Sequence, residues 1–506
     1  MGVIEKQSIK GTVYAYLGVG VGFITAGILQ PNFLTREQNG VLDLLWTWSL
    51  LLATLSTLGI NNVTNRLFPY FRNPGQKHHR YFGLVLWVTL TGFIVSMIIY
   101  LLLRPWIISD SLEQSALFVR YVDLIVPLTL FTAIYLVVDI YYAALYQSAK
   151  GILIKEFLMR LFILIALLLF VYHVLDFPKF VLGYTLALSL PGILISLLLL
   201  FDGEFIIRPD FSYLRPKLTR AIISVAGFGI IMTFSNIVVQ SIDRIMINSI
   251  LGLADTGIYG RAFIFGTLVS IASRPVNKIS NIVVAQAWKD RQTDTIRRIY
   301  SQSTLNQLLF GLLILVGILG NLDNIFRILP DNYASGKWVI LFIGLANLFQ
   351  MASGVSVAVM STSRHYRLLT FFILLFAGLI VVTNLLLIPR MGISGAALAS
   401  AISVGCYSLM RFIFLRIKYQ MQPYSWRHLA ILATGIIAYG VSLLLPDFNH
   451  PDHPISTLIL DIFLRSALIT IIYIGFNRIL GLSPDLNKQL NKLWHHSPKS
   501  ISKGEK

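Results

Sequence analysis

The chain has 506 residues, 56% of them hydrophobic and only 13% charged, with a formal net charge of +18. Soluble globular proteins average about 25% charged residues, so this composition excludes a mainly soluble protein and is typical of one that crosses a membrane many times. The one cysteine, Cys406, excludes an internal disulfide and any metal cluster built from cysteines.

Apolar runs of membrane length recur along the whole chain. A run of about 18 residues or more can cross a hydrocarbon core of about 30 Å at 1.5 Å per helical residue. The sequence therefore predicts an all-α polytopic membrane protein with about fourteen transmembrane helices. The predicted spans are residues 11–30, 40–61, 81–103, 118–142, 152–175, 180–200, 221–250, 255–273, 305–320, 338–360, 368–388, 395–415, 428–445 and 455–477.

The basic residues are distributed unevenly between alternate loops. Of the 41 lysines and arginines, 28 lie in the N-terminal segment, the even-numbered loops and the tail, and six lie in the odd-numbered loops. This bias predicts that both termini are cytoplasmic. Anionic lipid of the inner leaflet is then a sufficient partner for the net charge, so no nucleic acid is expected. The first ten residues precede an apolar run without a convincing cleavage site, so we expect the first span to be retained.

Two stretches of the chain have the same layout. Residues 32–40 (NFLTREQNG) align without a gap on residues 249–257, which lie 217 positions later, and Gly40 then falls on Gly257. Each stretch follows one apolar run and precedes another. Because six predicted spans separate the two copies, the copies have the same orientation. This predicts a parallel repeat, with a substrate site between the two halves near the middle of the membrane.

The repeat predicts how the chain is divided. We expect two six-helix lobes around a central cavity, followed by two additional transmembrane helices. The predicted parts are an N-terminal lobe (1–201), a cytoplasmic basic linker (202–220), a C-terminal lobe (221–417), the two additional helices (418–479) and a cytoplasmic basic tail (480–506).

Three motifs carry a resemblance to a known family. They are LGINNVTNRLFPYF (58–71), IDRIMINSILGLADTGIYGRA (242–262) and PRMGISGAALASAIS (389–403). With them, the sequence resembles the multidrug, oligosaccharidyl-lipid and polysaccharide exporter superfamily, and within it the polysaccharide transporters and O-antigen flippases. The resemblance in topology covers roughly residues 10–417.

The resemblance implies a transporter rather than an enzyme, without a cofactor. It implies a monomer in the bacterial inner membrane that works by alternating access. The substrate would be an undecaprenyl-diphosphate-linked glycan, flipped for export of O-antigen (lipopolysaccharide), capsule or exopolysaccharide. The polysaccharide polymerase machinery is then a candidate partner. Many such flippases have twelve helices, whereas relatives that flip the peptidoglycan precursor have fourteen, so that substrate stays open.

Moving a glycan diphosphate through lipid requires positive charge for the phosphates and hydrogen-bonding groups for the sugars. Arginine suits phosphate because its guanidinium is always charged and presents a fork of donors. An intramembrane charge is costly, so it is expected to face a cavity or a partner. The alternatives are structural: an ion pair with a nearby acid, such as Glu156 with Arg160, or hydrogen bonds between helices. The candidate substrate-binding residues are Arg261, Arg244, Arg160, Asn236, Gln240, Asn347 and Gln350.

Intramembrane carboxylates are candidates for binding a coupling ion, H⁺ or Na⁺. The candidates are Asp43, Asp139 and Asp243; pairing with an arginine of another helix is the alternative. No metal site is predicted, because the histidines and aspartates of residues 447–453 (DFNHPDH) are typical of a polar turn. No phosphate-binding glycine loop of the GxxxxGK[ST] type occurs, so nothing indicates direct use of ATP.

Three other functions compete with glycan flipping. A drug/cation antiporter of the same superfamily would need unpaired acids in an aromatic site, which Arg244 and Arg261 disfavour. A peptidoglycan-precursor flippase is favoured by the helix count. A membrane scaffold or glycosyltransferase partner is the fourth reading. A glycan polymerase would carry a large external loop, and here all the external loops are short.

Overall fold

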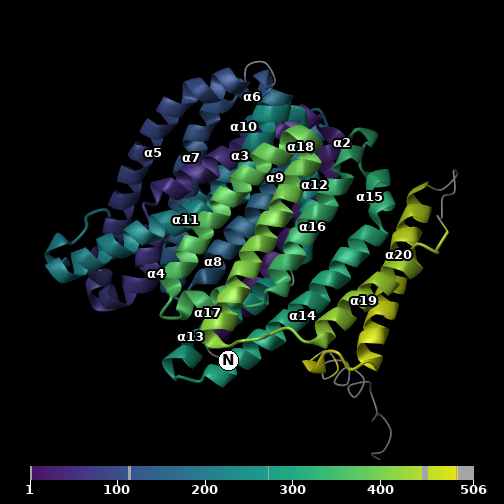
Figure 1. The fold of residues 1–506 in the computed structure, drawn as a ribbon. Helices are drawn as coiled ribbons and strands as arrows, with labels where there is room; N and C mark the ends of the chain where they lie inside the picture. The colour runs from purple at the N-terminus through teal and green to yellow at the C-terminus, as the bar shows by residue number, and fades with distance from the viewer. Residues whose placement is uncertain (1–2, 112–114, 272, 447–453, 486, 488–506) are drawn as a thin grey trace, which may run out of the picture. The chain divides into compact units, whose positions relative to one another are not determined.

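The structure is a computed structural model that describes residues 3–111, 115–271, 273–446, 454–485 and 487. These residues form helices joined by turns and short loops, and no strand occurs among them (Figure 1). The predicted all-α polytopic fold is therefore confirmed for this part of the chain. The DFNHPDH segment and most of the predicted basic tail lie outside the described residues.

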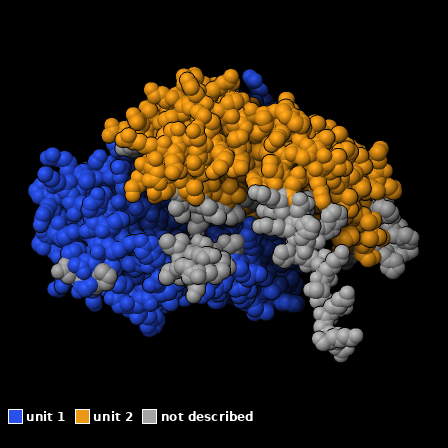
Figure 2. Space-filling view, turned by 90° about the horizontal axis from the view of Figure 1, so that it is seen from below, with its two compact units in different colours: residues 1–264, 373–400 blue, residues 265–372, 401–506 orange. Residues whose placement is uncertain are grey.

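The chain divides into two compact units, each of which is described by itself. Unit 1 comprises residues 1–264 and 373–400 (blue in Figure 2). Two apolar clusters form its core: one draws largely on α3, α9 and α10, and the other on α4, α5 and α7. Its helices are α1 (Val3–Gly22), α2 (Gln30–Phe33), α3 (Arg36–Ser56), α4 (Ile60–Phe71), α5 (Tyr81–Ser111), α6 (Ala116–Val119), α7 (Ile125–Ala144), α8 (Ser148–Ile152), α9 (Met159–Val171), α10 (Phe177–Phe201), α11 (Pro216–Leu251) and most of α12 (Leu253–Thr267).

Unit 2 comprises residues 265–372 and 401–506 (orange in Figure 2). The central helix of its core is α14, which packs against α16, α19 and α20. Its helices are α13 (Ser273–Lys289), α14 (Thr293–Gly320), α15 (Leu322–Ile328), α16 (Lys337–Ala352), α17 (Ser356–Thr362), α19 (Trp426–Ser442) and α20 (Pro454–Ile479). The long helix α18 (Tyr366–Tyr419) contributes to both units.

All fourteen predicted spans fall on helical segments. Among the described residues, nine helices are long and apolar enough to cross a membrane, or ten if the bent pair α3–α4 is one span. One of the nine, α18, covers two predicted spans, because it continues through a break at Gly392, where φ is 61°. That value favours glycine, since a side chain is strained in the left-handed region. The count of fourteen stays a prediction, as do the lobe boundaries at residues 201 and 221.

The two copies of the predicted repeat begin their second helices at corresponding positions. Helix α3 begins at Arg36 and α12 begins at Leu253, which are also 217 positions apart. The two helices cross at the aligned glycines: a Cβ on Gly257 would overlap the carbonyl oxygen of Arg36, and one on Gly40 would overlap that of Leu253. Small residues let membrane helices approach this closely. The crossing brings polar side chains of α3 and α12 together.

Candidate functional site

A polar stripe runs along one face of α11. Asn236, Gln240 and Arg244 are spaced four residues apart, so they lie on the same side of the helix. Asn236 and Gln240 are exposed, and the Gln240 side-chain nitrogen lies 3.5 Å from the Asn236 side-chain oxygen. An exposed polar stripe on a membrane-spanning helix requires water, a polar ligand or another polar surface beside it. These three residues were sequence candidates for binding substrate.

Arg244 ends this stripe without an ion pair among the described residues. Its guanidinium carbon lies 4.8 Å from the centre of the Phe263 ring, in cation–π geometry. Its Nη1 lies 3.5 Å from the carbonyl oxygen of Gln240, on the preceding turn. The side chain is half-buried. Its positive charge is therefore held by an aromatic face rather than cancelled by a carboxylate.

Arg261 is placed differently, in a buried ion pair with Asp43. Its Nη2 contacts Asp43 Oδ1, and the two side chains are 4% and 14% exposed. Arg261 lies on α12 and Asp43 lies on α3, next to the glycine crossing. A Cβ at Gly260 would overlap the second carboxylate oxygen of Asp43, so glycine at position 260 makes room for this carboxylate. The predicted substrate arginine and the predicted ion-coupling aspartate are thus partners.

The first span completes this cluster. Arg261 Nη1 contacts the side-chain oxygen of Gln30 and lies 3.3 Å from the carbonyl oxygen of Ala26. Ala26 belongs to a π-helical segment, Phe23–Leu29, and Gln30 directly follows it. π-helical turns frequently occur at functional sites. Arg261 Nε and Asp43 Oδ2 have no hydrogen-bond partner, so the buried pair retains unused donor and acceptor capacity.

Asp243 is 5% exposed and lies among neutral donors. The hydroxyl of Tyr259 donates to it at 2.7 Å, the hydroxyl of Ser400 at 2.5 Å, and the Asn384 amide nitrogen at 2.7 Å. Tyr259 lies on α12, and Asn384 and Ser400 lie on opposite sides of the break at Gly392 in α18. Three hydrogen bonds hold this carboxylate, and it forms no ion pair within the described part of unit 1.

Two further candidates lie where α1 packs against the fifth predicted span. Arg160 pairs with Glu156 at 2.7 Å, as the i, i+4 spacing predicts, and lies against Gly22 of α1. Asp139 projects from α7 toward Gly151, where an added Cβ would overlap its carboxylate. Lys155 lies between these groups in sequence, and its ammonium is 4.9 Å from the Tyr135 ring centre. The region is a mixed-charge cluster rather than a purely cationic lining.

The two candidates in unit 2 both make internal contacts. Asn347 donates to the backbone oxygens of Ile343 (2.9 Å) and Gly266 (3.4 Å), and the second bond joins α16 to α12. Gln350 is exposed and accepts a hydrogen bond from Arg411 at 3.4 Å. Arg411 is fully buried, with its guanidinium 4.2 Å from the ring of Tyr407. These contacts are of the kind that hold neighbouring helices together.

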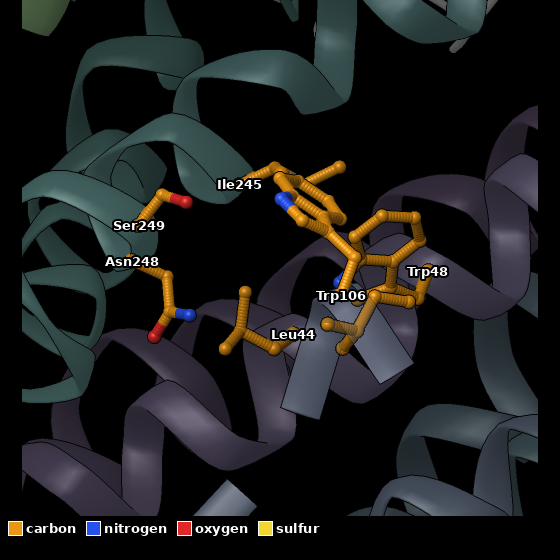
Figure 3. A pocket seen from close by; sticks show the side chains of 7 residues that line it. Leu44, Trp48, Trp106, Ile245, Asn248 and Ser249 are labelled. Atoms are coloured by element: carbon orange, nitrogen blue, oxygen red, sulfur yellow. The ribbon is translucent and has the colours of Figure 1, made fainter. Parts of the chain in front are cut away.

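A small hollow lies between α3, α5 and α11 in unit 1. Figure 3 shows Asn248 and Ser249 on one side of it, with Trp48 and Trp106 on the other. Its volume is about 10 Å³, which is room for about one water molecule. This hollow cannot hold a sugar, so it carries no part of the candidate site.

Sequence reasoning missed the groups that surround the two buried aspartates. Gln30, Tyr259, Asn384 and Ser400 are polar residues inside or beside predicted spans, and that position is the only signal that could have found them. Among the described residues, no group of three or more histidine, cysteine or acidic side chains is placed to hold a metal ion.

The ion pair between Arg261 and Asp43 makes a prediction about stability. Asp43→Asn leaves Arg261 buried without a counter-charge, and breaking a buried pair in this way costs about 3–5 kcal/mol. Adding Arg261→Gln removes that charge, so the double variant should lose at least about 1 kcal/mol less than the sum of the two single changes. Denaturant unfolding of the purified protein in detergent measures all three.

The matched control is Asp123→Asn, because Asp123 pairs with Arg104 at 3.0 Å in an exposed setting. Screening by solvent makes such pairs weak, so this change should be nearly silent. Additive losses at positions 43 and 261 would contradict the structural account of the pair.

The family model described as polysaccharide biosynthesis protein matches residues 7–284, more than half of the chain. A search of curated proteins finds no match.

Several solved structures share the fold. Lipid II flippase MurJ in an inward closed conformation has a TM-score of 0.70 at 13% identity, covering 93% of this chain and 99% of that one. An inward-facing multidrug resistance MATE family transporter has a TM-score of 0.57 at 12% identity, covering 81% and 98%. A MOP superfamily transporter from Pyrococcus furiosus has a TM-score of 0.53 at 13% identity, covering 82% and 96%. These likenesses concern the fold. The chain belongs to the polysaccharide biosynthesis protein family and is a multi-pass membrane protein.

Proposed function

We propose that the protein is a flippase for a lipid-linked oligosaccharide, an undecaprenyl-diphosphate glycan destined for O-antigen, capsule or exopolysaccharide. It works as a monomer by alternating access in the bacterial inner membrane, with both termini in the cytoplasm. Membership in the polysaccharide biosynthesis family supports a glycan substrate. The resemblance of the three sequence motifs supports the same substrate class.

The observation that carries this proposal is the stripe on α11. A lipid-linked glycan has two unlike parts: hydroxyl-rich sugars and an anionic diphosphate. The stripe presents two exposed amides, Asn236 and Gln240, followed by Arg244, whose charge no described carboxylate cancels. The amides can hydrogen-bond sugar hydroxyls, and the guanidinium can bind phosphate oxygens through paired donors. An organic-cation substrate would be repelled by this arginine.

Arg261 is proposed to act as a second, gated cation. In the structure its charge is paired with Asp43 and it is 3% exposed, so it binds a diphosphate only if that pair opens. A diphosphate competes well for a guanidinium because it offers more negative charge than one carboxylate. Substrate binding would thereby be coupled to the packing of α3 against α12. The mixed-charge cluster of Arg160 would line the path from the cytoplasm.

Asp243 is the best supported of the three candidates for a coupling ion. Its neighbours Tyr259 and Ser400 offer hydroxyl oxygens, and the buried Oδ1 of Asn384 has no hydrogen-bond partner. Rotation of the Asn384 amide would direct a third neighbouring oxygen toward the carboxylate. Oxygen ligands suit a hard cation, and the carboxylate alone suits H⁺. Because Asn384 and Ser400 flank the break in α18, ion binding would act on the bend of that helix.

Two alternatives would give different experimental results. The solved structure with a TM-score of 0.70 is a lipid II flippase, and it covers 93% of this chain; at 13% identity this likeness concerns the fold alone. A peptidoglycan-precursor flippase would be essential, and its depletion would cause lysis. Dye efflux that depends on Asp43 or Asp139 would instead support a drug/cation antiporter.

Arg244 provides the direct test in cells. In a strain that depends on this gene, Arg244→Gln should reduce surface glycan at least tenfold and cause the lipid-linked unit to accumulate, while Arg244→Lys should keep part of the activity. The reason is that lysine retains the charge but loses the fork of donors. Gel analysis of surface glycan, with protein level checked, measures the effect.

Arg104→Gln is the matched control, since it removes one arginine from an exposed ion pair outside the stripe. Normal glycan in the Arg244→Gln strain would refute a role for this residue in transport. Arg244 is a cleaner target than Arg261, whose replacement also disturbs a buried pair.

Asp243→Asn tests the coupling site, because the amide keeps the size of the side chain but neither ionises nor attracts a cation. We expect transport in everted membrane vesicles to lose its dependence on the Na⁺ or pH gradient. Asp139→Asn, made in parallel, tests the other candidate that is not paired with Arg261. A gradient dependence that survives Asp243→Asn and disappears with Asp139→Asn would move the coupling site to Asp139.

A further inference from the structure

Arg411 is a fully buried cation on the C-terminal part of α18, in unit 2. The residue is 0% exposed. A guanidinium stays charged in proteins, so Arg411 cannot become neutral as a buried lysine can. Burying a charge is costly unless an opposite charge lies beside it. The stripe on α11 and the two buried aspartates belong to unit 1, so this cation is a separate feature of the molecule.

The groups that touch the Arg411 guanidinium are all neutral. Its Nη2 donates to the hydroxyls of Ser408 at 3.1 Å and Ser353 at 3.2 Å, and to the amide oxygen of Gln350 at 3.4 Å. Its guanidinium carbon lies 4.2 Å from the centre of the Tyr407 ring. Hydroxyls, an amide and an aromatic face stabilise a cation without cancelling its charge.

Most donors of this guanidinium are unused. Nε and Nη1 are buried and have no hydrogen-bond partner. These two atoms carry more than half of the N–H groups of an arginine side chain. A buried donor without an acceptor destabilises the fold. A water molecule would accept from these donors but leave the charge unbalanced, whereas an anion does both.

The ionisable side chains that act on the charge of Arg411 are tyrosines. They are Tyr407, Tyr300 and Tyr424, and no described carboxylate pairs with it. Tyr300, on α14, is fully buried, and its hydroxyl has no hydrogen-bond partner. A tyrosine hydroxyl can donate to an anion, as the guanidinium can. Unused donors of two kinds therefore occur in this region, without an acid to receive them.

Arg411 differs in this respect from the other buried arginines that the structure describes. Arg261 contacts Asp43. Arg465 Nε lies 3.0 Å from both carboxylate oxygens of Asp461. Each of these two arginines therefore has its counter-charge within the protein. A counter-charge for Arg411 has to come from a bound ion.

We propose that a small monovalent inorganic anion, such as chloride, binds beside Arg411 inside unit 2. One unbalanced positive charge requires one negative charge, and complete burial leaves no room for a lipid headgroup. The ion accepts charge-assisted hydrogen bonds from Nε or Nη1. It thereby stabilises the packing of α18 against α16, whose Gln350 already contacts Nη2. This inference does not depend on which substrate the protein moves.

Equilibrium dialysis of the purified full chain in detergent tests the proposal, with radioactive chloride in sodium gluconate at constant ionic strength. The parent protein should bind a single chloride per chain that Arg411→Met does not bind. Methionine is the replacement because it is unbranched, adaptable in a core and uncharged. Bromide should displace the chloride, whereas gluconate should not, because it is too large for an enclosed site.

Stability gives a second measurement on the same samples. Transfer from chloride to gluconate should shorten the half-life of the parent protein at a fixed temperature at least threefold, because a ligand of the folded state is removed. The half-life of Arg411→Met should not change, since this variant has no charge that needs the ion.

Arg416→Gln is the matched control, because it removes one exposed arginine from the same helix. This control should bind chloride and respond to gluconate like the parent. A parent protein that binds no chloride saturably, or chloride binding that survives Arg411→Met, overturns the proposal. If Arg411→Met is not monodisperse, crystals of the parent soaked in bromide carry the test. Anomalous scattering should then place bromide within hydrogen-bond distance of Arg411 Nε or Nη1, and its absence there overturns the site.

Discussion

A charge inside the apolar part of a membrane protein is stable only beside an opposite charge, a set of hydrogen-bonding groups or water. The ion pair between Arg261 and Asp43 meets this constraint by joining two helices, α12 and α3. It depends on the glycines at 40, 257 and 260, because side chains there would overlap the neighbouring backbone or the carboxylate itself. The packing of α3 against α12 and the position of a buried cation are thus one structural feature.

The same constraint separates the polar groups of unit 1 by the partners that surround them. Groups that find partners inside the protein, such as Arg261 with Asp43, hold helices together. Exposed polar groups and a charge without an ion pair, such as Asn236 and Gln240 with Arg244, require a polar ligand or water. Asp243 lies between these cases, because neutral donors surround its carboxylate without cancelling a charge. We therefore propose that the stripe binds substrate and that Asp243 binds the coupling ion.

Local patterns were enough to predict the helices from the sequence. Apolar runs placed the spans, and the alignment of Gly40 with Gly257 anticipated two helices that begin 217 positions apart. The four-residue spacing of Asn236, Gln240 and Arg244 also places these residues on one face of a helix. Pairing could not be predicted in the same way: Asp43 has no partner on its own helix, and its partner lies 218 positions away. The hydrogen-bond partners of Asp243 could not be predicted either. Two of them, Asn384 and Ser400, lie on another helix, on opposite sides of the break in α18.

Transport by the purified protein in lipid vesicles tests the central claim most directly. Vesicles would contain an undecaprenyl-diphosphate oligosaccharide labelled on its sugar, and an added impermeant enzyme would cleave only the glycan on the outer face. We predict that the parent protein exposes the protected glycan within minutes and that Arg244→Gln exposes it no faster than protein-free vesicles do. Equal exposure with and without the parent protein, in vesicles that contain folded protein, would contradict the assignment as a lipid-linked glycan flippase.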